Sequence, residues 1–133
     1  MLRASWTILP TGPRAVSVAR VAARLVLSAR GVGVGDPDSF ARLEPVIAEL
    51  VSNGVRHAGG CDRLELAFDG ACLTVGAVDH GADDPELKAH GPPDAGRGLA
   101  IVDAMSASWG WHRFPGGKCV WARLDSGPTR HRR

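Results

Sequence analysis

Apolar side chains in the middle of the chain recur at three- and four-residue intervals, the spacing of one helix face. These positions are Val46, Ile47, Leu50, Val51 and Val55. Asp38 or Ser39 can cap the start of this helix, and Gly59-Gly60 predicts its end at about Ala58. Pro45 removes a backbone hydrogen bond wherever it lies inside a helix, so we expect a kink or a restart beside it.

Two further helices are predicted on either side of this one. The first covers residues 14 to about 28, and Arg20 and Arg24 share one of its faces, which indicates either a solvated surface or a partner surface. Its apolar face is expected to consist of Val18, Ala22, Leu25, Val26 and Ala29. The other helix is short and covers residues 100–105. Its inward residues are expected to be Leu99, Val102 and Met105.

A hairpin is predicted directly after the central helix. Residues 63–68 alternate apolar and polar side chains, and Asp69-Gly70 supplies a two-residue turn. This turn places Leu66 opposite Leu73. Because side chains repeat every two residues along a strand, the same face continues to Asp79 at the end of the second strand. A buried carboxylate is costly without a partner, so Asp79 needs one.

A second hairpin is predicted around the turn Pro115-Gly116-Gly117, with strands at residues 107–114 and 118–124. Trp109 and Trp111 share one face of its first strand, where sheet packing is a simpler interpretation than ligand stacking. One face of its second strand carries Val120, Ala122 and Leu124.

The predicted order is an edge strand at residues 6–9, two helices, a hairpin, a loop, a helix and a hairpin. Antiparallel hairpins with helices on one face give an α+β fold, a two-layer α/β sandwich with a mixed, mostly antiparallel sheet. Residues 1–125 are predicted to form one domain, a size that supports one core. Residues 126–133 are predicted to be a basic, frayed tail rather than a binding arm.

The composition is that of an ordinary globular chain: 133 residues, 44% hydrophobic and 23% charged. The formal net charge of +2, much of it from the basic tail, is too small to indicate nucleic-acid binding. Cys61, Cys72 and Cys119 leave one thiol unpaired in any disulfide scheme, which fits reduced thiols in a cytoplasm. No apolar run suits a signal peptide or a membrane span. We therefore expect a soluble cytoplasmic domain that contacts neither nucleic acid nor membrane.

Three polar features are expected to meet in this arrangement. Glu49 and Asn53 lie four residues apart on the central helix, so their side chains project one above the other. Asn53 offers an oxygen suited to Mg²⁺, and Glu49 can take a proton from an attacking hydroxyl or water. Asp79 can accept a hydrogen bond from the exocyclic amine of a purine. The turn at residues 96–99 opens a helix, where backbone N–H groups and the helix dipole favour a phosphate.

Each feature alone also fits a structural role. An E-x-x-x-N spacing arises often by chance and then marks a surface pair, while a single G-x-G-L is usually a turn. Asp79 can cap a loop through its own backbone. Their order and spacing together predict an ATP·Mg²⁺ site.

These motifs resemble those of the GHKL ATPases, the histidine-kinase-like ATPases with the Bergerat ATP-binding fold. Residues 49–58 (ELVSNGVRHA) match the N box, and Val78-Asp79-His80-Gly81 matches the first glycine box. Residues 96–102 (GRGLAIV) match the second glycine box, and residues 117–121 (GKCVW) match the closing strand. Within the superfamily, the chain is similar to the small anti-sigma-factor serine/threonine kinases over about residues 14–124.

The resemblance implies a role for each candidate residue. Glu49 would be the general base, Asn53 the Mg²⁺ ligand, and Asp79 the adenine contact, supported by Gly81. Residues 82–95 would form the ATP lid. The residues that close on the phosphates would be Gly96, Arg97, Gly98 and Leu99.

The resemblance also implies an ATP-binding regulator that phosphorylates a serine or threonine of an anti-anti-sigma partner and binds a sigma factor when that partner is absent. Relatives often form homodimers. This chain departs from the pattern at Asp83, where a D-x-G-x-G box has its second glycine, and at Pro45, one turn before Glu49. These departures leave an alternative: a non-catalytic partner-binding module with the same fold and weak or no nucleotide turnover.

Overall fold

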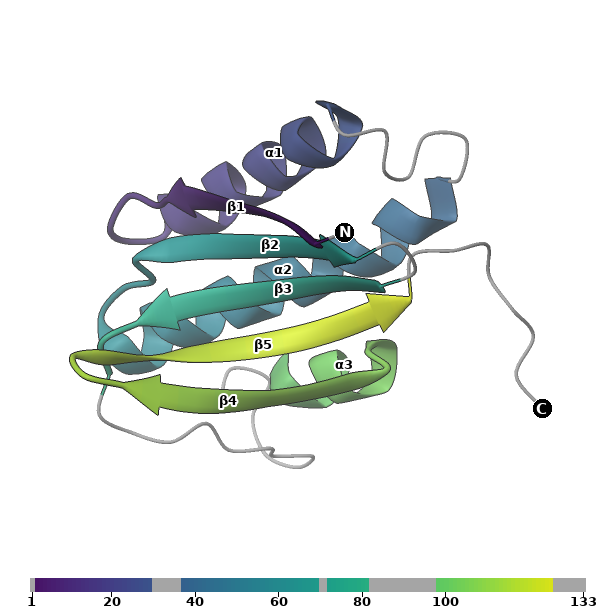
Figure 1. Ribbon diagram of the computed structural model, residues 1–133. Coiled ribbons are helices and arrows are strands. Elements are labelled where there is room, and N and C mark those ends of the chain that lie inside the picture. The colour runs from purple at the N-terminus through teal and green to yellow at the C-terminus, as the bar shows by residue number, and fades with distance from the viewer. Residues whose placement is uncertain (1, 30–36, 70–71, 82–97, 126–133) are drawn as a thin grey trace.

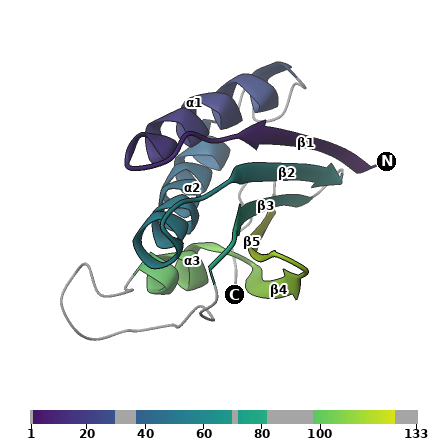
Figure 2. The same cartoon turned by 90° about the vertical axis from the view of Figure 1, so that its left-hand side faces the viewer.

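The computed structural model describes residues 2–29, 37–69, 72–81 and 98–125. In chain order they form β1 (Leu2–Ile8), α1 (Arg14–Ala29), α2 (Pro37–Ala58), β2 (Arg63–Asp69), β3 (Cys72–Asp79), α3 (Gly98–Met105), β4 (Ser108–Phe114) and β5 (Gly117–Asp125). The strands form one sheet in the order β1-β2-β3-β5-β4, and the three helices cover one of its faces (Figure 1, Figure 2).

This arrangement confirms the predicted two-layer α+β sandwich, with β1 as an edge strand. All four strand pairs in the described part of the chain are antiparallel, so the sheet is antiparallel throughout rather than mixed. The predicted tail at residues 126–133 lies outside the described residues, as does the predicted lid at residues 82–95.

The first hairpin pairs two residues away from the predicted register. Leu66 lies opposite Val75 rather than Leu73, and Asp69, predicted in the turn, pairs with Cys72 at the end of β2. A shift of two residues keeps every side chain on its predicted face, because the strand period is two. Asp79 therefore still lies on the face covered by helices, as predicted.

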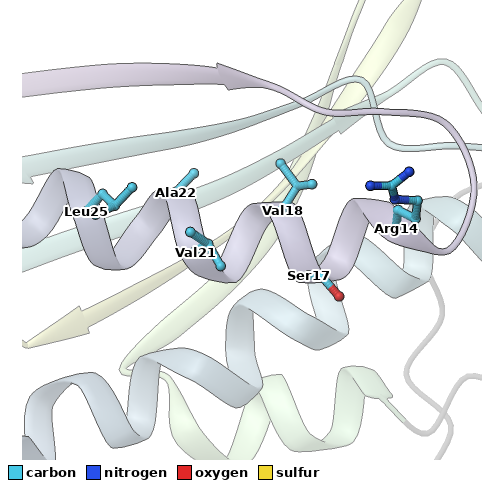
Figure 3. Close-up of a pocket in the computed structure, with 6 residues that line it drawn as sticks. All are labelled: Arg14, Ser17, Val18, Val21, Ala22 and Leu25. Carbon is cyan, nitrogen blue, oxygen red and sulfur yellow. The ribbon is translucent and has the colours of Figure 1, made fainter.

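The helix α1 packs through a face that its apolar spacing does not identify. Its buried side chains are Ala15, Ala19, Ala23 and Leu27. Leu25, predicted to face inward, is 65% exposed. A surface hollow of about 400 Å³ on this outer side is lined by Arg14, Ser17, Val18, Val21, Ala22 and Leu25 (Figure 3). Both faces of α1 carry apolar residues, so the prediction chose the larger side chains, whereas the small alanines allow closer packing.

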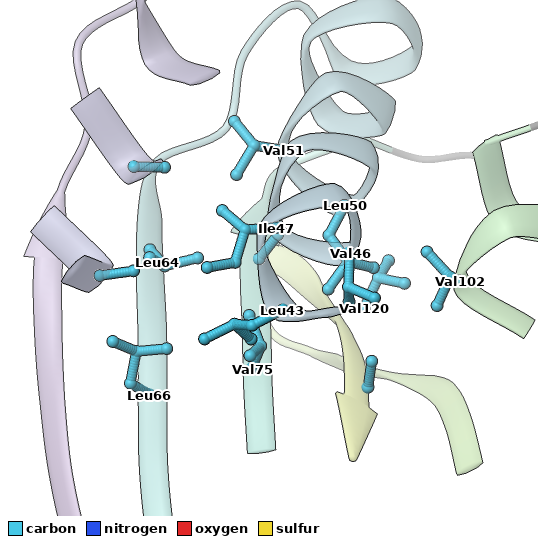
Figure 4. Close-up of a cluster of buried hydrophobic side chains, with 14 of the residues drawn as sticks. Leu43, Val46, Ile47, Leu50, Val51, Leu64, Leu66, Val75, Val102 and Val120 are labelled. Atoms are coloured by element: carbon cyan, nitrogen blue, oxygen red, sulfur yellow. The ribbon is translucent and has the colours of Figure 1, made fainter. Parts of the chain in front are cut away.

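The central helix α2 runs from Pro37 to Ala58 with Pro45 inside it, so of the two expected outcomes the restart is wrong, and a kink stays a prediction. Its buried face packs on the sheet and α3 (Figure 4). The α2 residues in this core are Leu43, Val46, Ile47, Leu50 and Val51. Each such burial contributes about 1.5–3 kcal/mol. Their sum exceeds the roughly 3 kcal/mol that a proline costs inside a helix.

Ion pairs join α1 to α2 at the solvent edge of this layer. Arg20 and Arg24 each contact Glu44, at 3.2 and 3.1 Å. The face of α1 that carries these arginines is therefore partly a contact with α2. Such exposed pairs contribute little to stability, about 0–1 kcal/mol each.

The helix α3 closes the other end of the helical layer. Leu99 and Val102 are buried as predicted, whereas Met105 is 42% exposed. Trp109 packs against the core, and its indole N–H donates to Asp103 Oδ1 at 2.8 Å, which joins β4 to α3. This confirms sheet packing for Trp109. None of the helices in the described residues is long and apolar enough to cross a membrane.

Candidate functional site

One terminus of each of three elements lies at the same end of the sheet. β3 ends there at Asp79, β5 begins there at Gly117, and α2 ends there at Ala58. A Cβ placed on Gly54 of α2 would lie 3.5 Å from Asp79 Oδ2 and 3.2 Å from Cys61 Cβ. The missing side chain at position 54 therefore lets α2 lie against the end of β3. This contact brings the N-box helix to the predicted base-binding carboxylate.

Asp79 is buried on the helix-covered face, with 1% of its surface exposed. Its Oδ1 accepts a hydrogen bond from the Gly81 backbone N–H at 2.8 Å and another from Lys118 Nζ at 2.7 Å. A carboxylate in the interior needs a charged or hydrogen-bonding partner. That partner is Lys118.

Lys118 is absent from the residues predicted for the site, although the strand period contains the signal. Val120 and Ala122 share the buried face of β5, and a period of two adds Lys118 to that face. The pairing of β3 with β5 sets Lys118 directly opposite Asp79. Only 2% of Lys118 is exposed. An inward lysine opposite an inward aspartate indicates an internal ion pair.

Gly81 lies where the chain leaves β3, and no side chain fits at this position. An added Cβ would lie 2.7 Å from Ala58 Cβ and 2.8 Å from Lys118 Nζ. Its carbonyl oxygen accepts a hydrogen bond from Arg113 Nη1 at 3.3 Å. The glycine therefore holds the segment after Asp79 against both α2 and the ammonium of Lys118.

The two polar residues of the N box differ in their surroundings. Asn53 is 5% exposed, and within the described part of the chain its carboxamide forms no hydrogen bond. Glu49 lies one turn earlier, is half-buried, and makes no ion pair with the described residues. Neither side chain is therefore held by a hydrogen bond or an ion pair to another described residue, and both are left to interact with a ligand.

The predicted phosphate end of the site is only partly described. Gly96 and Arg97 lie outside the described residues, as does Asp83. Gly98 is the first residue of α3, and Leu99 is 1% exposed within the hydrophobic core. The Leu99 side chain therefore anchors α3, and its backbone is the part left for a ligand.

The cysteines near this edge are structural rather than reactive. Burial raises the pKa of Cys61 to about 12, with the Asp79 and Asp62 carboxylates adding to the effect. Burial likewise raises the pKa of Cys119 to about 11. Both remain thiols at neutral pH, and the thiolate is the nucleophilic form. All three cysteines are free, which agrees with the expectation of reduced thiols.

The available oxygens suit a Mg²⁺ ion that takes most of its ligands from phosphate and water. The described residues contain no group of three or more His, Cys, Asp or Glu side chains that could hold a metal ion. Mg²⁺ commonly binds through one or two protein oxygens and keeps the rest for substrate and solvent. The unbonded carboxamide of Asn53 fits that use.

The chain matches the family model of the histidine kinase-like ATPase domain over residues 9–124. It therefore belongs to this family, as the N box and glycine boxes predicted. No curated protein matches the chain.

A solved structure of the RsbU and RsbW domains of Rv1364c from Mycobacterium tuberculosis is similar to this chain, with 21% identity and a TM-score of 0.68. The match covers 96% of this chain and 34% of that chain, so this chain spans about a third of its length. The histidine kinase AdeS of Acinetobacter baumannii matches at 16% identity and a TM-score of 0.47, covering 95% and 70% of the two chains. The first likeness shows the fold alone.

Proposed function

We propose that this chain binds ATP with Mg²⁺ and phosphorylates a serine or threonine of an anti-anti-sigma partner, as a regulator of transcription that also binds a sigma factor. The observation that carries the proposal is the position of Asn53. Its side chain is 5% exposed, and it directly precedes Gly54, the α2 residue whose Cβ would lie 3.5 Å from Asp79 Oδ2. Membership of the histidine kinase-like ATPase family supports the nucleotide. The RsbW domain named in the similar structure, with the motif resemblance, supports the class of partner.

In this proposal, the two N-box residues have separate tasks. The Asn53 oxygen would hold Mg²⁺, which when bound would neutralise charge on the phosphates. Glu49 accepts the proton of the partner's hydroxyl while the hydroxyl oxygen bonds to the γ-phosphorus. The bond from that phosphorus to the bridging oxygen breaks, and ADP leaves with the electron pair. The chain contributes mainly positioning and charge stabilisation.

The remaining residues of the proposed site hold the two ends of the nucleotide. Asp79 and Gly81 lie at the base end. Backbone N–H groups from the turn before α3, at Gly96, Arg97, Gly98 and Leu99, hold phosphate oxygens at the other end.

The test is phosphoryl transfer from γ-labelled ATP to a protein acceptor in a cell extract that lacks this chain. Wild type with Mg²⁺ should label one acceptor on serine or threonine, and Glu49→Gln should lower the rate by about 10²-fold or more. Glu65→Gln is the matched control, because Glu65 lies on β2 and pairs with Arg63 instead. Equal labelling by wild type and Glu49→Gln would exclude Glu49 as the base.

The alternative is a non-catalytic module that binds a partner, and the exposed apolar side of α1 favours it. Val21 and Leu25 are 59% and 65% exposed there. In that case Leu25→Glu should abolish retention of the partner, while Glu49→Gln leaves retention and every other measured property unchanged. No transfer and no heat on mixing with ATP would support this module over the kinase.

A further inference from the structure

The carboxylate of Asp79, at the base end of the proposed site, has a buried ionic partner that the predicted site did not include. Lys118 Nζ lies 2.7 Å from Asp79 Oδ1, and each of the two side chains is 2% exposed. The two residues lie directly opposite one another on β3 and β5. The position of the lysine is therefore fixed by the pairing of the two strands.

The two oxygens of Asp79 differ in what they contact. Oδ1 accepts hydrogen bonds from Lys118 Nζ and from the Gly81 N–H, whereas Oδ2 accepts none from the described residues. In the described part of the chain, the fully buried side-chain nitrogen and oxygen atoms without a partner are Arg42 Nε and Ser106 Oγ. Oδ2 is therefore unbonded without being fully enclosed, which leaves it as an acceptor for a ligand.

The ammonium of Lys118 has two effects on this acceptor. Its positive charge favours the ionised form of the carboxylate, because an unpaired carboxylate in the interior is costly and tends to take up a proton. Its bond to Oδ1, together with that of the Gly81 N–H, also fixes the orientation of the carboxylate. An ionised carboxylate has acceptors and no donor, so Oδ2 can only accept.

We propose that Lys118 is a positioning residue for base recognition: by holding Oδ1 of the ionised Asp79, it leaves Oδ2 to accept a hydrogen bond from the 6-amino group of adenine. The 6-oxo group of hypoxanthine is itself an acceptor, so at the same place two acceptors would face one another. Adenine is therefore preferred to a 6-oxopurine. Lys118 does not touch the base in this arrangement and acts through Asp79.

This inference rests on the proposed function, because it concerns how the nucleotide of that site is recognised. The probes are ATP and ITP, each with Mg²⁺, whose bases differ in the group at position 6 and in the N1 proton that accompanies it. Leaving one buried polar group unpaired should weaken binding roughly tenfold or more. Calorimetry on wild type should therefore give a dissociation constant for ATP at least about tenfold below that for ITP.

Variants test whether this preference depends on Lys118. Without the ammonium, Asp79 takes up a proton more readily, and a carboxylic acid can donate to a 6-oxo group. Lys118→Met should therefore bring the two dissociation constants close together, whereas a purely structural role would weaken both nucleotides alike and keep their ratio. Arg123→Met is the matched control, because it removes a positive charge from an exposed position of the same strand and should keep the preference.

A measurement on wild type avoids any loss of stability in the variant. The chain contains two lysines, Lys88 and Lys118, so lysine labelled with a nitrogen isotope gives at most two ammonium signals by NMR, which Lys88→Arg assigns. A buried, hydrogen-bonded ammonium exchanges its protons slowly, so the Lys118 signal should be visible. It should persist when Mg·ATP binds, because adenine uses the other oxygen of Asp79.

The outcomes separate the inference from the proposed function. Binding of neither nucleotide removes the proposed function, and the inference with it. Three results overturn the inference and leave the proposed function standing: equal binding of ATP and ITP by wild type, an unchanged preference in Lys118→Met shown to be folded by circular dichroism, or loss of the Lys118 signal when Mg·ATP binds. A preference for ATP in wild type and in Arg123→Met, reduced in Lys118→Met, with the Lys118 signal retained, supports the inference. If Lys118→Met is unfolded, the NMR result on wild type decides.

Discussion

Breaking the buried ion pair between Asp79 and Lys118 should destabilise the fold strongly when only one partner is replaced. Lys118→Met leaves a carboxylate in the interior with one remaining hydrogen bond, from the Gly81 N–H. Removing one partner of a buried pair costs about 3–5 kcal/mol, because the other charge stays desolvated and uncompensated. Domains of this size are stable by about 5–15 kcal/mol, so the variant should remain folded with a much reduced margin.

Replacing both partners should cost far less than the sum of the two single changes. The double variant Asp79→Asn with Lys118→Met removes both charges of this pair, and its asparagine oxygen can still accept from Gly81. Neutral replacements of buried pairs are often neutral or stabilising. The pair should therefore show a coupling energy of about 2 kcal/mol or more in a double-mutant cycle, as expected for residues in direct contact.

Urea unfolding followed by tryptophan fluorescence measures each free energy, since Trp121 lies on β5 three residues from Lys118. The denaturant slope should be unchanged across the four proteins, which shows that the surface exposed on unfolding is the same. A cost below about 1 kcal/mol for Lys118→Met, or additive single changes, would refute the reasoning. Either result would mean that water reaches the pair and screens it.

Three further predictions concern other positions. Gly81→Ala places a Cβ 2.7 Å from Ala58 Cβ and should lower thermal stability by about 1–3 kcal/mol, whereas Gly60→Ala, with nothing within 4 Å, should not. The free energy of unfolding should fall as pH rises from about 9 towards 12, because folding raises the pKa of the Cys61 thiol and holds it protonated. Urea midpoints measured across this pH range should depend less on pH in a Cys61→Ala variant. Glu44→Gln removes two exposed ion pairs to α1 and should change the unfolding free energy by about 1 kcal/mol or less; a larger change in urea unfolding would show that these pairs are not solvent-screened.

The sheet could be predicted well because its information is local. Alternation with a period of two assigns each strand residue to a face, and this survives even a wrong register, as at Leu66. The register was predicted less well, because Asp69 was expected in the turn, whereas it is the last residue of β2 and pairs with Cys72. A shift of two residues leaves the alternation of faces unchanged, so the pattern of side chains does not distinguish the two registers.

The helices show where local spacing is insufficient. α2 has one apolar face, and Val46, Ile47, Leu50 and Val51 are buried as predicted, whereas Val55 is only partly buried. α1 has two such faces, and the prediction chose Leu25 over the alanines that are buried. Small side chains contribute little to a hydrophobic pattern, yet they allow helices to pack closely against their neighbours.

The sequence predicted which residues belong to the candidate site, but it did not predict which residues contact one another there. The burial of Asp79 followed from register. The identity of its partner depends on which strand lies beside β3, and the strand order was not part of the prediction. The roles of Glu49 and Asn53 in catalysis and metal binding remain predictions.

The ion pair also has a consequence for how the chain matures during synthesis. Asp79 and Lys118 are separated by 39 positions, and β5, which carries the lysine, is synthesised after all the other strands in the described part of the chain. Contacts between residues this distant in sequence form late in folding, because the chain between them must be ordered first. Until β5 pairs with β3, the β2–β3 hairpin ends in a carboxylate that stays in water. Pairing of β5 with β3 therefore extends the sheet and neutralises the base end of the site in one event, so a nascent chain that stops short of β5 lacks both.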